Sequence, residues 1–213
     1  MKKSSPTPNE DLQVIRNMME RSSRFLSLSG LSGVFAGICA LIGAAVAWIF
    51  ILDNGQVKYD EYMRSLGSAA TSDIRMYLAL DALLVLITAA IGAAWFSVRK
   101  ARKAGQPFWT APTRQLLVHL LIPLFTGGIF VVILVMRNNI ELVASAMLVF
   151  YGLSLVNAGK FTFGEIHYLG LTEIALGILA GVFINFGGLL WAIGFGLMHI
   201  VYGTLMYYRY ERA

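Results

Sequence analysis

The chain has 213 residues, of which 57% are hydrophobic and only 14% are charged, and its formal net charge is +5. Soluble globular domains carry about 25% charged residues, so this composition excludes an ordinary soluble domain and indicates an integral membrane protein. The predicted fold class is all-α, because lipid offers no partner to an unpaired backbone amide and the apolar stretches lack the alternation of a barrel strand.

The predicted elements divide the chain into an N-terminal segment, residues 1–25, and a transmembrane domain, residues 26–213. Thr7-Pro8-Asn9-Glu10 has the form of a capping box, so an amphipathic helix is predicted there, either in the membrane interface or docked on cytoplasmic loops. Apolar segments of about 20 residues, long enough to cross a bilayer, then recur along the chain. The six predicted transmembrane helices cover 26–52, 75–98, 115–136, 140–158, 167–185 and 188–208.

Basic residues are distributed unevenly between the two sides of this predicted six-helix bundle. The N-terminal segment, the loop after the second helix and the later loops on that side hold 13 of the 17 Lys and Arg residues, and the other side holds four. The positive-inside rule therefore predicts cytoplasmic N- and C-termini in a multi-pass protein of the bacterial inner membrane. Anionic lipids on the cytoplasmic side are the expected partners of these cations, and no nucleic-acid partner is needed to explain them.

Polar residues inside the second, third and fourth predicted helices are candidate ligand- or proton-binding groups. Asp81 lies six residues from the outer end of the second helix. His119 in the third helix is predicted to lie level with Asn157 in the fourth, as counted from the turn between them. Pro123 removes a backbone donor and crowds the carbonyl of His119, so a hinge is predicted at Pro123 with Gly127 and Gly128.

The last two predicted helices carry Glu173 and His199, each 13 positions from residue 186 at the centre of the turn that joins them. In an antiparallel pair these side chains lie at the same depth. Glycines accompany each of them at helical spacing, and we expect these glycines on the same face as the polar residue: Gly170 and Gly177 for Glu173, and Gly196 and Gly203 for His199. Because a bare charge in mid-membrane costs about 2.5–3.5 kcal/mol, Glu173 and His199 are predicted to be partners in the bundle interior.

Helical rise orders these polar groups by depth as a ladder, from Asp81 through the Glu173 and His199 layer to His119 and Asn157. Glu165 and His167, at the inner mouth of the fifth predicted helix, are expected to be solvated. The ladder favours a membrane protein in which Glu173 and His199 bind or pass a proton or a small polar or amphipathic ligand, in transport or in sensing.

Two alternatives remain open from the sequence. In the first, His119, Glu173 and His199 are ligands of zinc or haem in an intramembrane enzyme, with Asp81 as a further ligand or base, although neither cofactor is predicted and no HExxH or CxxC spacing supports one. The second alternative is a non-catalytic membrane subunit or assembly factor in which the polar pairs fix helix register. A homo-oligomer is compatible with each of these readings. Motifs of soluble-type catalysis are absent, so the sequence favours a protein that is not an enzyme.

Overall fold

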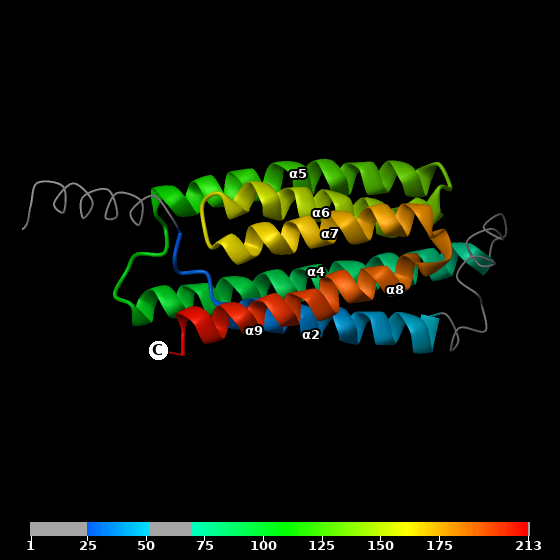
Figure 1. Cartoon of the computed structure of the whole chain (residues 1–213). Coiled ribbons are helices and arrows are strands. Elements are labelled where there is room, and N and C mark those ends of the chain that lie inside the picture. Colours follow the sequence, from blue (N-terminus) through cyan, green and yellow to red (C-terminus); the bar gives the residue numbers. More distant parts are fainter. Residues whose placement is uncertain (1–24, 52–69, 213) are drawn as a thin grey trace, which may run out of the picture.

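The structure is a computed structural model that describes residues 25–51 and 70–212 (Figure 1). The predicted N-terminal helix within residues 1–25 lies outside the described residues, apart from Phe25. The described part of the chain is helical and contains no β-strand. Six of its helices are long and apolar enough to cross a membrane, as the sequence predicts.

The first three of these helices are α2 (Gly30–Val46), which continues into the π-helical turn η1 (Ala47–Ile51), α4 (Ala70–Lys103) and α5 (Ala111–Met136). A 3-10 turn, η3 (Ile140–Leu142), leads into α6 (Val143–Gly159), and α7 (Gly164–Val182) follows. The last helical stretch comprises the 3-10 turn η4 (Ile184–Phe186), α8 (Gly187–Trp191), the π-helical η5 (Ala192–Met198) and α9 (His199–Tyr210).

The second and third membrane-length helices are longer than their predicted apolar segments. α4 begins five residues before the predicted start at residue 75 and ends five residues after residue 98. Hydropathy marks only the apolar part of a helix, whereas Lys and Arg are good helix formers and interact favourably with the dipole in its last turn. α5 begins at Ala111, not at residue 115, because the Thr110 side chain accepts a hydrogen bond from the Thr113 amide and caps the helix.

The helices form two layers, with α5, α6 and α7 in one and α4, α2 and the α8 to α9 stretch in the other (Figure 1). Within the first layer α6 packs between α5 and α7, and within the second α2 packs between α4 and α9. Contacts of α7 with α8, η5 and α9 join the two layers. The polar residues Glu173 and His199 therefore lie where the layers meet.

Glycines allow direct backbone contact within each layer. A Cβ atom on Gly203 of α9 would lie 2.6 Å from the amide nitrogen of Val34 in α2, and one on Gly170 of α7 would lie 2.7 Å from the carbonyl oxygen of Gly152 in α6. Gly177 likewise meets α6, and Gly196 meets α2. These four glycines therefore serve close packing of helices within the layers.

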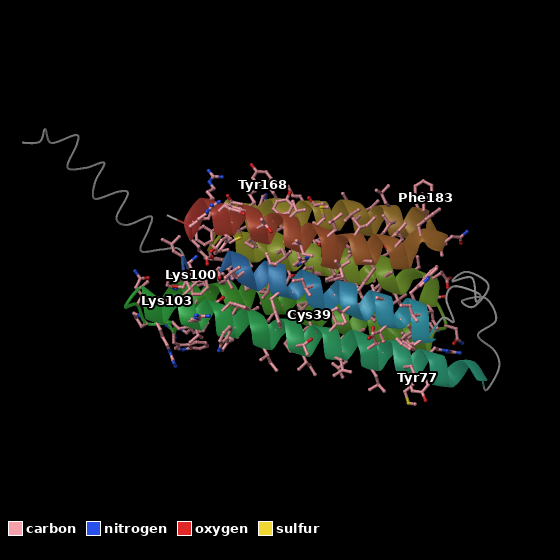
Figure 2. The ribbon with its side chains drawn as sticks, turned by 90° about the horizontal axis from the view of Figure 1, so that it is seen from below. Cys39, Tyr77, Lys100, Lys103, Tyr168 and Phe183 are labelled. Atoms are coloured by element: carbon pink, nitrogen blue, oxygen red, sulfur yellow. The ribbon has the colours of Figure 1, made fainter. Side chains whose placement is uncertain are left out.

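The two ends of the bundle differ in charge. We call the end that carries Lys100 and Lys103 the basic end, and the end that carries Tyr77 and Phe183 the distal end (Figure 2). At the distal end an Arg75 guanidinium nitrogen donates to Asn138 Oδ1 at 2.9 Å, which joins α4 to the turn after α5.

At the basic end the Glu211 carboxylate, just after α9, binds the N-terminus of α2. It accepts hydrogen bonds from the Gly30 amide at 2.5 Å and from Ser29 Oγ at 3.0 Å, and the Lys100 ammonium of α4 lies 3.3 Å away. Ser29 provides no side-chain cap of its own, so Glu211 supplies the acceptor and the negative charge that a helix N-terminus favours. Glu211 thereby joins α2, α4 and α9.

Candidate functional site

Glu173 lies at the middle of α7, nine residues from either end of the helix, and its side chain is fully buried. Neither carboxylate oxygen accepts a hydrogen bond from any group in the described part of the chain. The nearest charged or chargeable partner is His199, whose Nδ1 lies 3.4 Å from Glu173 Oε1. The structure thus brings together the two residues that the sequence pairs by depth.

His199 is the first residue of α9 and directly follows the π-helical segment η5. The residue is 5% exposed, and its Nδ1 lies 3.0 Å from the Gly194 carbonyl oxygen. A carbonyl can only accept, so Nδ1 carries a proton, and in the neutral ring Nε2 is then an acceptor. π-Helical turns occur often at functional sites, and this one aims the Gly194 carbonyl at the imidazole.

Tyr151 of α6 completes the polar group, and the sequence reasoning missed it. Its hydroxyl lies 2.7 Å from His199 Nε2, so the hydroxyl donates when the ring is neutral. The Tyr151 ring also packs against Phe195, with ring centroids 4.9 Å apart. The depth count that pairs Glu173 with His199 could also have indicated Tyr151. Counted from the turn between α6 and α7, Tyr151 and Glu173 differ in depth by no more than two residues.

Protein atoms pack directly on the Glu173 carboxylate. A Cβ atom added to Gly194 would overlap Glu173 Oε2 and would lie 2.6 Å from Leu148 Cδ2. Only glycine at residue 194 therefore lets η5 approach the carboxylate this closely. The three polar groups and the Gly194 carbonyl form one buried cluster, which we call the Glu173 site: Tyr151, Glu173, Gly194 and His199.

The other predicted site residues do not join this cluster. Asp81 of α4 faces α2, where a Cβ atom on Gly43 would lie 3.4 Å from Asp81 Oδ2. His119 is exposed on α5, with Nδ1 2.8 Å from its own helix's Gln115 carbonyl oxygen and its ring centroid 4.6 Å from that of Phe161. Asn157 is half-buried on α6.

The metal-ligand set suggested by the sequence is not assembled either. Within residues 25–51 and 70–212, no three His, Cys, Asp or Glu side chains come close enough to hold a metal ion. His119 lies on α5, which packs against α6, whereas Glu173 and His199 lie where α7 meets α9. A count of helical residues gives only the depth of a side chain along the bundle and not its position around the bundle, so it does not show that His119 lies on a helix that does not reach Glu173 and His199.

The predicted hinge lies in a helix that continues without interruption from Ala111 to Met136. Gly127 packs on α6, since a Cβ atom there would overlap the Phe150 side chain, whereas Gly128 has open space on its Cβ side. Gly127 is thus a contact glycine in the structure. Motion at Pro123 stays a prediction.

The expectation that Glu165 is solvated is wrong. The residue is only 5% exposed, and its Oε1 accepts a hydrogen bond from an Arg209 guanidinium nitrogen at 2.9 Å. The Tyr210 hydroxyl donates to the same carboxylate at 3.1 Å. These partners come from the far end of the chain, and together with Glu165 they form a second polar cluster at the basic end of the seam between α7 and α9.

No protein-family model, curated protein or solved structure matches this chain.

Proposed function

We propose that the chain is a multi-pass protein of the bacterial inner membrane whose Glu173 site binds and releases a proton. Large apolar side chains cover the outward faces of α4 and α5, among them Leu84, Ile91, Ile122 and Phe125, each more than 60% exposed. A contiguous apolar surface of this kind marks contact with lipid or with another protein. An α-helix pairs its own backbone N–H and C=O groups in hydrogen bonds, so it can cross a bilayer, where lipid offers these groups no partner.

The proposed orientation places the basic end in the cytoplasm. The described cations Lys100, Arg102, Lys103 and Arg209 lie in the last turns of α4 and α9, and the positive-inside rule assigns such an end to the cytoplasmic side. A reporter fused after Arg212 tests this orientation. A fluorescent protein should fold there and fluoresce, whereas an alkaline phosphatase that needs an oxidising compartment should be inactive.

The observation that carries the proton-binding proposal is the burial of Glu173 without a hydrogen-bond donor on either oxygen in the described residues, 3.4 Å from a histidine nitrogen. With His199 neutral, an ionised Glu173 would leave a net negative charge at the middle of α7. Such a charge costs about 2.5–3.5 kcal/mol at the centre of a membrane. One added proton removes the net charge, either as a carboxylic acid beside imidazole or as an ion pair with imidazolium.

The close approach of Gly194 to the carboxylate, with the Leu148 side chain also beside Gly194, favours a proton over a larger ligand. Histidine is the side chain whose charge changes most readily near neutral pH, and its two nitrogens here face different partners. When His199 gains a proton at Nε2, that nitrogen becomes a donor, so the Tyr151 hydroxyl must turn and accept. Proton binding is thereby linked to the hydrogen bond between α6 and α9.

The test is a pH titration of the purified protein labelled with ¹⁵N histidine and ¹³C glutamate, followed by NMR from about pH 5 to about pH 9. The chain has three histidines, so His119 and His167 serve as internal references in the same sample. We expect His199 and Glu173 to respond together to uptake of one proton, and the His199 response to change in Glu173→Gln.

The proposal is refuted if His199 and Glu173 each keep a single protonation state over the whole range in the wild type. A Glu173→Gln variant that leaves the His199 titration unaltered would show that the two groups do not share a proton. His199→Gln identifies the His199 signals, and size-exclusion chromatography of each variant shows whether the bundle is intact.

A further inference from the structure

The seam between α7 and α9 is polar on one side of the Glu173 site only. Towards the basic end, polar pairs follow one another at an interval of two helical turns. Thr172 and Tyr202 form the first pair, with Thr172 Oγ1 3.3 Å from the Tyr202 hydroxyl oxygen. Glu165 and Arg209 form the second, seven residues further along each helix. This polar seam therefore leads from mid-helix to the charged end of the bundle.

Hydrogen-bond directions in the first pair can be assigned. Thr172 Oγ1 donates to the carbonyl oxygen of Tyr168 at 3.0 Å, so it receives the Tyr202 hydroxyl proton. Tyr202 lies one turn from His199 on α9, and Thr172 is adjacent to Glu173 on α7. Both side chains are half-buried, so they bridge the buried site and the surface of the seam.

Towards the distal end the same two helical stretches carry no polar pair, and Asn185 in the turn η4 is exposed. Residues 174–183 are all apolar or glycine, and residues 186–198 add only the indole of Trp191 as a polar group. Trp191 and Phe195 lie with ring centroids 5.0 Å apart, and Phe195 packs on His199 at 6.1 Å. Ser145 of α6 lies on this side, but its hydroxyl donates to the Gly177 carbonyl oxygen at 2.7 Å.

We infer that the Glu173 site exchanges its proton with the basic end alone, along the seam that Thr172 and Tyr202 line. This inference rests on the proposed function, because it names the route for the same proton. A hydronium ion in the seam loses one O–H bond and leaves as water, and the new bond forms at a Glu173 oxygen or at His199 Nε2. The two hydroxyls hydrogen-bond the water that carries the proton, and the Glu165 carboxylate and Arg209 guanidinium lie at its entrance.

One-sided exchange makes the site a sensor of pH on that side and not a conduit across the bundle. Two other ionisable side chains belong to the Glu173 site. Tyr151 of α6 contacts His199, and His199 of α9 lies next to Glu173. The apolar run on α7, η5 and the aromatic rings blocks the distal direction.

The test measures how fast the infrared signals of Glu173 and His199 respond to a pH jump in Thr172→Val and Tyr202→Phe. Both substitutions keep shape and remove one hydroxyl. We expect each substitution to slow the infrared response about fivefold, because the water that carries the proton loses one neutral hydrogen bond in the seam. The equilibrium pH titration of Glu173 and His199 should stay as in the wild type. Ser145→Ala on the distal side and Tyr208→Phe, whose ring is exposed on α9, are the matched controls and should respond at the wild-type rate.

Wild-type rates in both Thr172→Val and Tyr202→Phe would overturn the inference while leaving the proposed function in place. Slowing in Ser145→Ala as large as in Thr172→Val would also overturn it, because the proton would then use the distal side. A wild-type protein in which neither Glu173 nor His199 titrates would refute the proposed function, and this is read from the equilibrium titration before any rate is compared.

Discussion

The carboxylate of Glu173 lies directly against Gly194, on the π-helical segment that precedes His199. In Gly194→Ala the new methyl group would overlap Glu173 Oε2, and the end of a flexible side chain can move aside. We therefore expect a folded protein with a displaced carboxylate. A double-mutant cycle of Glu173→Gln and His199→Gln measures the interaction between the two groups, which should fall from about 1–3 kcal/mol to below about 0.5 kcal/mol when Gly194→Ala is the background.

Gly128→Ala is the control for this substitution. It adds the same methyl group in a helix, but a Cβ atom there meets nothing within 4 Å. The coupling between Glu173 and His199 should be unchanged, and stability should be equal or raised by up to about 1 kcal/mol. Equal coupling energies in the two backgrounds would contradict the role assigned to Gly194.

Tyr151→Phe removes the hydroxyl that lies 2.7 Å from His199 Nε2. The buried imidazole nitrogen then lacks its partner from α6, which typically costs about 1–3 kcal/mol. We expect a lower thermal unfolding midpoint in detergent and a changed His199 Nε2 chemical shift. Tyr168→Phe, on a ring that is 63% exposed, should change neither quantity. An unshifted Nε2 resonance in Tyr151→Phe would show that this hydrogen bond is not formed in solution.

Gly203→Ala tests the direct backbone contact of α9 with α2. The added Cβ atom would lie 2.6 Å from the Val34 amide nitrogen and 2.7 Å from the Gly30 carbonyl oxygen. Backbone atoms cannot turn away, so the helices must separate, and overpacking of this kind costs about 1–3 kcal/mol. Thermal unfolding should show that loss, whereas Gly164→Ala, with open space on its Cβ side, should behave as the wild type.

Glu211→Ala removes the acceptor that binds the Gly30 amide, Ser29 and Lys100. Loss of a helix cap together with its charge should lower the free energy of unfolding by about 1–2 kcal/mol. Glu211→Gln keeps one acceptor oxygen and should lose less, and Ser29→Ala should lose least. This graded order, measured by thermal unfolding of the three variants side by side, would be contradicted by equal midpoints.

The six helices could be predicted from the sequence because each apolar run is long and ends at charged residues or, between the last two helices, at the turn Asn185-Phe186-Gly187-Gly188. The pairing of Glu173 with His199 could also be predicted, since both lie at equal distances from one short turn. Depth along the bundle is only one coordinate, however. Counting residues from a turn does not give the position of a side chain around the bundle. In the structure Asp81, His119 and the Glu173 and His199 pair accordingly lie in separate places.

Tyr151 and Glu165 show a second limit. A tyrosine in an apolar helix has the same pattern as a packing residue, so Tyr151 is recognised only through its contact with His199. Glu165 is predicted to be solvated because its partners Arg209 and Tyr210 lie more than 40 residues away in sequence. Contacts between remote segments determine both environments, and hydrophobic periodicity carries no information about them.

The position of α2 between α4 and α9 has a consequence for biosynthesis. At about 5–20 residues per second, a ribosome that has finished α2 needs roughly 10–30 s to complete α9, the helix that covers Gly30, Gly33 and Gly37. During that interval the face of α2 that carries Gly30, Gly33 and Gly37 is not covered by α9, and the contact between His199 and Glu173 has not formed. We expect nascent chains that stop before α9 to be recognised by membrane quality control, since the Glu173 site is complete only once α9 has been made.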